Sequence, residues 1–146
     1  MNDLKNLYQE VILDHSKHPR HFHALDPCDH SATGYNPLCG DNLKIFVRMD
    51  GDTIAEVSFV GDGCAISKAS ASLMTDLARG KTLAEFAHLY HDFHHIATTQ
   101  DPIPDSVGKL KVLAGVREYP SRVKCATLAW HTLDAALHGK NEAKTE

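Results

Sequence analysis

The feature that most constrains the fold is a hairpin signal in the first half of the chain. From residue 41 to residue 49 apolar and polar side chains alternate, which is typical of a strand with one buried face. Asp50 and Gly51 suit a tight turn, and residues 53–60 alternate again. The sequence therefore predicts two paired antiparallel strands, with residues 31–35 as a further edge strand.

Helical periodicity dominates the rest of the chain. Apolar residues recur every three or four positions in the first segment, which has to end before Pro19. A similar stripe begins after Cys64, and Thr82 with Glu85 forms a capping box for the next helix. Two more helices are predicted over residues 106–116 and from Pro120 to Gly139.

These elements predict an α+β fold in a single domain spanning residues 1–146. About three antiparallel strands would pack with one face against about five α-helices. Residues 140–146 are polar enough to form a flexible tail.

Composition limits the function classes. The chain of 146 residues is 42% hydrophobic and 23% charged, and no apolar run approaches the ~20 residues of a membrane span. The net charge of -4 comes with dispersed Lys and Arg, so neither a membrane nor a nucleic acid is an expected partner. The first residues lack the apolar core of a secretion signal, which predicts a cytoplasmic protein. Cysteines there are more often ligands or nucleophiles than disulfides.

Three cysteines and one aspartate form the candidate metal site. Cys39 and Asp41 lie on a turn just before the first hairpin strand, and Cys64 lies just after the second. Because these strands pair, the start of the first strand and the end of the second lie at the same end of the sheet. Cys125 supplies a third thiolate, and three sulfurs with one carboxylate oxygen give the four-coordinate set that zinc prefers.

The position of each ligand indicates its role. Cys64 begins a helix, where backbone amides favour the thiolate, and Cys125 is expected in the first turn of the last helix. Asp41 is a harder ligand than the thiolates, which favours a site built for ligand exchange. Cys39, on a glycine-containing turn, is the ligand expected to leave the metal.

Simpler interpretations exist for each of these residues. The three cysteines are equally compatible, on composition alone, with ordinary core thiols. Cys28 has no motif and is interpreted as a non-ligand. The histidine-rich stretches at residues 15–23 and 88–95 are interpreted as solvated, although His91 and His95 are one helical turn apart. The serines after Cys64 lack the partners of a hydrolase triad.

Three motifs resemble the signatures of the IscU/NifU N-terminal-like iron–sulfur cluster assembly proteins. They read Asn-Pro-x-Cys-Gly-Asp at residues 36–41, Gly-x-Gly-Cys-x-Ile-Ser-x-Ala-Ser-x-Ser at residues 61–72, and Arg-x-Lys-Cys-x-x-Leu-x-Trp at residues 122–130. The resemblance covers almost the whole chain and implies a SufE/NifU-like fold. It also implies the metal ligands, which are Cys39, Asp41, Cys64 and Cys125.

One departure selects a branch of this family. The scaffold branch has a histidine directly before the third cysteine, whereas this chain has Lys124 there, and the interval between the last two cysteines is longer. Both features resemble the SufU-type branch. That resemblance implies a zinc-dependent sulfurtransferase in which Cys39 accepts persulfide sulfur from a pyridoxal-phosphate cysteine desulfurase of the SufS type. Downstream iron–sulfur assembly proteins would receive the sulfur.

Two basic residues near Cys125 have expected roles. Three thiolates and a carboxylate around a divalent cation leave negative charge, which Lys124 and Arg122 would offset. Arg122 also matches a motif position, and the resemblance implies that it contacts the desulfurase. Catalytic turnover would belong to the complex with the desulfurase, so the chain is not predicted to be a stand-alone enzyme. Two alternatives remain at this point: a scaffold on which the same residues hold a [2Fe–2S] cluster, and an interaction module with structural zinc.

Overall fold

The computed structural model describes residues 2–37, 40–103 and 105–144. It contains four α-helices, one 3-10 segment and four strands in the described residues. In chain order these are α1 (Asn2–Lys17), β1 (His30–Asn36), β2 (Asp41–Asp50), β3 (Thr53–Asp62), α2 (Ala65–Ala78), α3 (Leu83–Thr98), η1 (Asp105–Glu118), α4 (Pro120–Leu137) and β4 (Glu142–Lys144).

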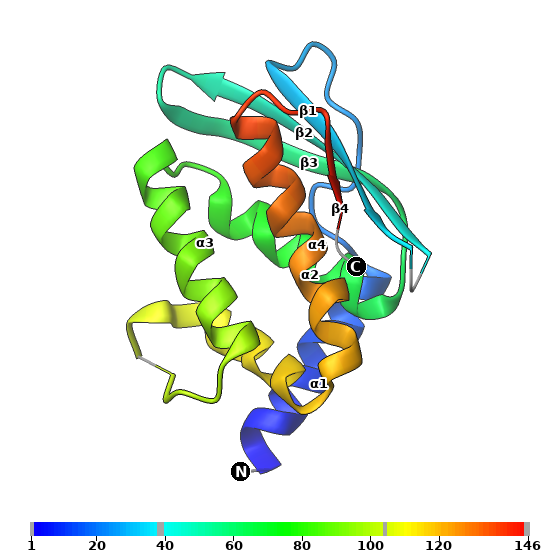
Figure 1. Cartoon of the computed structure of the whole chain (residues 1–146), viewed down its shortest axis with the longest axis vertical. Coiled ribbons are helices and arrows are strands. Elements are labelled where there is room, and N and C mark those ends of the chain that lie inside the picture. Colours follow the sequence, from blue (N-terminus) through cyan, green and yellow to red (C-terminus); the bar gives the residue numbers. More distant parts are fainter. Residues whose placement is uncertain (1, 38–39, 104, 145–146) are drawn as a thin grey trace.

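The strands form one mixed sheet in the order β3-β2-β1-β4. The first three strands pair antiparallel, and β4 runs parallel to β1 at its outer edge. Figure 1 shows the helices gathered on one face of this sheet, with α4 lying against it. The predicted α+β class and the hairpin are therefore confirmed.

Two elements differ from the sequence-based prediction. Three antiparallel strands and a flexible tail from Lys140 onward were expected, whereas Glu142–Lys144 form β4 and pair with residues 33–35 of β1. The α-helix expected over residues 106–116 is instead the 3-10 segment η1, interrupted by Gly108 at φ 59° and ψ -128°. Residue spacing does not reveal the long-range pairing of a three-residue polar strand, and a positive φ breaks α-helical hydrogen bonding.

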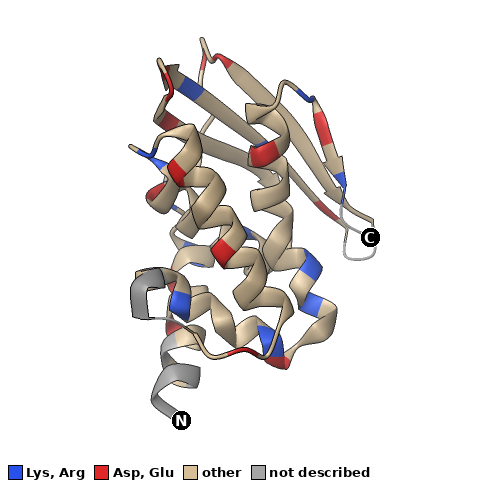
Figure 2. Ribbon diagram, turned by 60° about the vertical axis from the view of Figure 1, so that its left-hand side comes forward, with Lys and Arg blue, Asp and Glu red and all other residues tan. Residues whose placement is uncertain are grey.

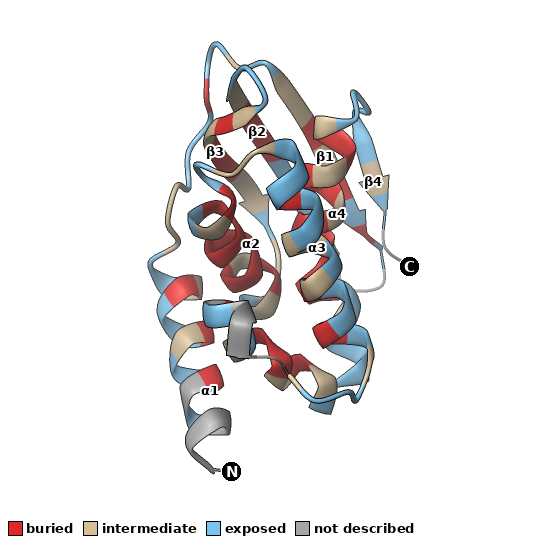
Figure 3. Ribbon diagram, turned by 90° about the vertical axis from the view of Figure 1, so that its left-hand side faces the viewer, coloured by how far each residue is buried: buried red, intermediate tan, exposed pale blue. Residues whose placement is uncertain are grey.

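The core lies between the sheet and the helices. The register sets Ile45 opposite Phe59 and Val47 opposite Val57, which places all four side chains on the buried face. Trp130 of α4 stacks on Phe93 of α3 with ring centroids 4.3 Å apart. Figure 3 shows α2 buried along most of its length, whereas the outer side of α3 faces solvent.

Two contacts fix α4 in position. Ser70 of α2 accepts the indole N–H of Trp130 at 3.0 Å and donates its hydroxyl to the Ala126 carbonyl at 2.6 Å, so one buried hydroxyl joins α2 to α4. On the other side, α4 packs directly on β1 at Gly34. A Cβ at residue 34 would overlap Thr132 Oγ1 and lie 3.1 Å from Leu128 Cδ1. The absence of a side chain therefore sets the distance between helix and strand.

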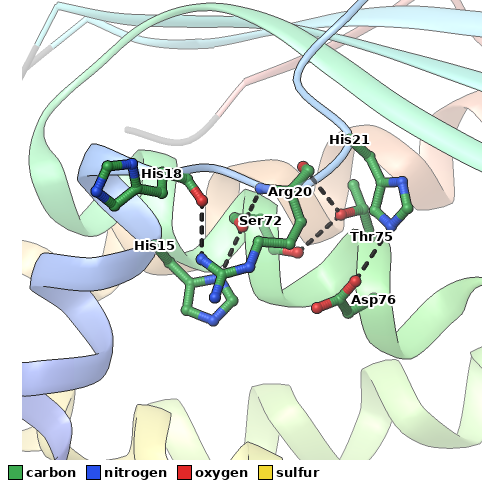
Figure 4. A network of polar contacts seen from close by, with 7 residues as sticks. All are labelled: His15, His18, Arg20, His21, Ser72, Thr75 and Asp76. Atoms are coloured by element: carbon green, nitrogen blue, oxygen red, sulfur yellow. Dashed lines mark hydrogen bonds and ion pairs between the residues drawn. The ribbon is translucent and has the colours of Figure 1, made fainter.

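A polar network anchors the segment after α1 to α2 (Figure 4). Ser72 Oγ accepts the backbone N–H of Arg20 at 2.8 Å and lies 2.7 Å from Nδ1 of the buried His15. His21 Nε2 lies 3.1 Å from Asp76 Oδ1. The histidines of residues 15–23 were interpreted as solvated, and His15 departs from that interpretation because it is part of the α1–α2 packing.

Charge is dispersed over the molecule. Figure 2 shows Lys and Arg interspersed with Asp and Glu along the helices and strands. Among the residues that the structure describes, no helix is long and apolar enough to cross a membrane.

Candidate metal centre

The hairpin brings the first two described ligand candidates together. Asn42 pairs with Asp62, so the start of β2 and the end of β3 lie side by side. Asp41 is the first residue of β2, and Cys64 is two residues beyond the end of β3, where it forms the N-cap of α2. The backbone N–H of Cys64 donates to Asp41 Oδ1 at 2.8 Å.

Cys125 reaches the same point from α4. It is the sixth residue of this helix, counting from Pro120, and is therefore in the second turn. The expectation that it lies in the first turn was wrong, because a helix that begins at Pro120 completes its first turn of about 3.6 residues before Cys125. Its thiol gains nothing from unpaired helix-end amides, and it is completely buried.

The ligand atoms of Asp41, Cys64 and Cys125 all lie within 4.8 Å of one another. This separation is compatible with common coordination, because two ligands of one zinc ion at 2.0–2.3 Å lie roughly 3–4 Å apart. In the part of the chain that the structure describes, no other group of three His, Cys, Asp or Glu side chains meets the same criterion.

Both sulfurs accept hydrogen bonds from N–H groups of the protein. The Ser67 backbone N–H donates to Cys64 Sγ at 3.4 Å, and the Asn36 side-chain amide donates to Cys125 Sγ at 3.6 Å. The contact with Cys125 is the largest influence on Cys64 and, together with the Ser67 amide, lowers the pKa of the Cys64 thiol to about 6. Burial and the Asp41 carboxylate oppose this shift. The site therefore favours the thiolate at neutral pH.

Asp41 gives the clearest indication that this group of side chains binds a metal. Its side chain is 2% exposed, and its second carboxylate oxygen, Oδ2, is buried without a hydrogen-bond partner among the described residues. Burial of an unpaired carboxylate oxygen is costly, and such groups are paired or coordinate a metal. With two thiols beside it, this oxygen fits a zinc-type donor set.

The glycine before Cys64 leaves room for this arrangement. A Cβ at Gly63 would lie 3.0 Å from both Asp41 Oδ1 and Ser67 Oγ. A larger residue would push the carboxylate away from the thiols. The sequence alone assigns neither Gly63 nor Asn36 a role at the centre. The available signal for Asn36 was its place as the first residue of the first motif, three positions before Cys39.

The other sequence-predicted residues divide into three groups. Cys39 lies outside the described residues, so its role stays a prediction. Arg122 and Lys124 are exposed at the start of α4, and Arg122 lines a groove of about 390 Å³ with Tyr8, Leu13 and other apolar side chains. Cys28 precedes β1 and lines a separate cavity at the far end of α4, apart from the candidate centre.

Comparison with known proteins identifies the family of the chain. The profile described as "NifU-like N terminal domain" matches residues 7–145. The chain belongs to this family. The resemblance inferred from the three motifs is therefore confirmed, and with it membership of a group of iron–sulfur cluster assembly proteins.

Individual relatives carry two different names. The chain is 40% identical over 138 residues to an "Iron-sulfur cluster assembly scaffold protein IscU" of Streptococcus pyogenes, covering 94% of this chain and 86% of the relative. It is 38% identical over 139 residues to a "Zinc-dependent sulfurtransferase SufU" of Bacillus subtilis, covering 92% of each chain.

A solved structure of a related protein has the same overall fold. A putative iron–sulfur cluster assembly scaffold protein for the SUF system from Fervidobacterium islandicum superposes with a TM-score of 0.82 at 33% identity. The match covers 90% of this chain and 96% of that structure. The family names thus include both a scaffold and a sulfurtransferase.

Proposed function

We propose that this protein is a sulfur acceptor of iron–sulfur cluster assembly, working in the cytoplasm with zinc bound at the candidate centre. The observation that carries the proposal is the buried Oδ2 of Asp41, which has no hydrogen-bond partner among the described residues and lies beside the thiols of Cys64 and Cys125. Iron–sulfur assembly itself follows from the family, whereas the zinc and the sulfur transfer are the proposal.

The metal would be held by Asp41, Cys64 and Cys125, with Cys39 as the fourth ligand. Bound zinc would supply stored thiolates, because coordination removes the thiol proton. The chain itself prepares for this role. The Asn36 amide and the Ser67 N–H stabilise negative charge on sulfur, and the N-terminal end of α2 adds a favourable dipole at Cys64.

The transfer step would take place at Cys39. Its thiolate attacks the outer sulfur of a persulfide on a SufS-type cysteine desulfurase. A sulfur–sulfur bond forms on Cys39, the desulfurase sulfur–sulfur bond breaks, and its electron pair stays on the desulfurase cysteine as thiolate. A downstream iron–sulfur assembly protein then takes the sulfur.

The surface beside the centre suits a partner protein. Ala65 and Ile66, directly after Cys64, line the same groove as Arg122, and so does the exposed Leu13. A mostly apolar lining with one guanidinium resembles the composition of protein interfaces, where arginine is enriched. We assign Arg122 to contact with the desulfurase and Lys124 to charge compensation at the centre.

A scaffold for a [2Fe–2S] cluster is the second candidate function. The names of relatives such as the Streptococcus pyogenes protein favour it, and three cysteines with one aspartate can also ligate a cluster. Lys124, in place of the histidine of the scaffold branch, favours the zinc-dependent sulfurtransferase instead.

The first experiment is elemental analysis of the freshly purified, untagged protein, together with its visible spectrum. About one zinc per chain without colour is expected; iron with inorganic sulfide would make the scaffold function primary.

The second experiment measures persulfide transfer from a SufS-type desulfurase. Cys39→Ser should abolish sulfur acceptance, whereas the matched Cys28→Ser variant should retain it. Full acceptance by Cys39→Ser would refute the assignment. Unfolding on zinc removal, with Cys39 dispensable, would indicate structural zinc.

A further inference from the structure

The outer side of α3 carries a row of histidines that the candidate centre does not use. His88, His91 and His95 are separated by three and four residues, so they lie on one face of the helix. The rings of His91 and His95 stack with centroids 6.5 Å apart and an interplanar angle of 10°. The side chains of His88 and His91 are 80% exposed. Figure 3 shows this side of α3 open to solvent.

Carboxylates accompany these imidazoles. Asp101, in the loop after α3, places Oδ2 at 2.9 Å from His95 Nε2. Asp92 lies between the other two rings, with Oδ2 at 3.5 Å from His88 Nε2 and Oδ1 at 3.8 Å from His91 Nδ1. Negative charge therefore surrounds the row, and this favours a cation.

The neighbouring His94 has a different environment. Its ring approaches Tyr90 and His131 in edge-on contacts, at centroid distances of 6.4 and 5.9 Å. It belongs to the junction between α3 and α4, where it contacts these two rings. His94, which lies between His91 and His95 in the sequence, therefore serves as a control position.

We propose that His91, His95 and Asp101 form a second site for a divalent cation that favours imidazole, such as Zn²⁺, Ni²⁺ or Cu²⁺. Two histidines four residues apart on one helix face are a recurrent chelating arrangement for zinc. Asp101 adds an oxygen ligand that is already adjacent to His95. Imidazole suits each of these ions, and carboxylate is an accepted zinc ligand.

This site is weaker than the cysteine centre for a structural reason. The described residues contain no preformed group of three ligand atoms here, so an ion has to rotate exposed side chains into place. Ordering them costs side-chain entropy. An ion bound there would join the loop at Asp101 to the end of α3. The proposal is independent of the sulfur-acceptor function, since it shares no residue with that centre.

The test is a titration of Zn²⁺ into untagged protein that already holds one equivalent at the cysteine centre. Isothermal calorimetry should detect one further, weaker equivalent. His91→Ala and His95→Ala should each weaken it by ~10-fold or more, since each removes one of two nitrogen ligands. Asp101→Asn should weaken it by a smaller factor. His94→Ala should leave it unchanged.

A second measurement needs no variant. Substoichiometric Ni²⁺ or Cu²⁺ should selectively broaden the backbone amide signals of residues 88–101 in the NMR spectrum of the zinc-loaded protein. The proposal is overturned by absence of a second equivalent, by equal loss in His94→Ala, or by broadening centred on other histidines.

Discussion

Removal of the Ser70 hydroxyl is expected to destabilise the protein although no apolar contact is lost. Ser70 is completely buried, and its oxygen both accepts from Trp130 Nε1 and donates to the Ala126 carbonyl. In Ser70→Ala the indole N–H stays buried without a partner, because Trp130 is itself completely buried. A buried donor without a partner costs more free energy than a donor that exchanges its protein hydrogen bond for one to water.

The magnitude follows from this single unpaired donor. Leaving a buried polar group unsatisfied costs about 1–3 kcal/mol, so we expect Ser70→Ala to lower the free energy of unfolding by about 2 kcal/mol. With a urea dependence of about 2 kcal/mol per molar, the unfolding midpoint should fall by about 1 M. That loss is a substantial part of the roughly 5–15 kcal/mol typical of a domain.

A matched control lies one turn earlier on α2. Ser67 is also completely buried, but its hydroxyl has no hydrogen-bond partner among the described residues. Ser67→Ala should therefore change the free energy of unfolding by less than about 0.5 kcal/mol. Urea unfolding of both variants, at equal metal content, measures the difference. A Ser70→Ala midpoint equal to that of Ser67→Ala would refute the reasoning.

Three further predictions concern other parts of the fold. Gly34→Ala should cost about 1–3 kcal/mol in urea unfolding, because its Cβ overlaps Thr132 Oγ1; Thr132→Ala in the same chain should recover part of this loss. Burial is the main cause that lowers the pKa of His131 below the usual value of a histidine. Below about pH 6.5 the unfolded state therefore binds more protons than the folded state, and the free energy of unfolding decreases as the pH falls. His131→Gln should reduce this decrease, measured as the difference in the free energy of unfolding between pH 7 and pH 5.5. Deletion of everything after Asn141 removes β4 and leaves the outer edge of β1 unpaired; light scattering should detect increased self-association with little loss of stability.

The sequence predicted the hairpin and most helices because those signals are local. Alternation over residues 41–60 requires only that one face be buried, and the Thr82–Glu85 capping box, present in the structure, marks a helix start without reference to the rest of the fold. It did not predict β4, whose three residues depend on a partner strand more than 100 positions away. Nor did it predict the η1 conformation, because the positive φ of Gly108 cannot be recognised from composition.

The same distinction between local and long-range signals applies to the candidate site. The pairing of two strands was enough to predict that Asp41 and Cys64 lie at one end of the sheet. The approach of Cys125 was inferred only from its motif, because the position of α4 depends on Gly34, which lies outside the three motifs, and on Ser70, whose motif position does not reveal its contact with α4. The contribution of Asn36 was missed for a related reason: a side-chain donor to sulfur is identified only when the helix bearing that sulfur is in place.

The way the ligands are held bears on what the metal does. Asp41 accepts the Cys64 N–H, Cys64 Sγ accepts the Ser67 N–H, and Cys125 Sγ accepts the Asn36 amide, so each of the three side chains is held by a hydrogen-bond donor of the protein. The two helices that carry the thiols, α2 and α4, are joined by the buried hydroxyl of Ser70, and α4 also packs on α3 through Trp130 and Phe93. A metal that binds such a preformed site adds stability through its binding free energy, whereas zinc in a small metal-dependent module creates the fold. The described ligands are therefore better suited to retaining a reactive metal centre than to folding around a structural one, and this favours the sulfur-acceptor proposal over the interaction module.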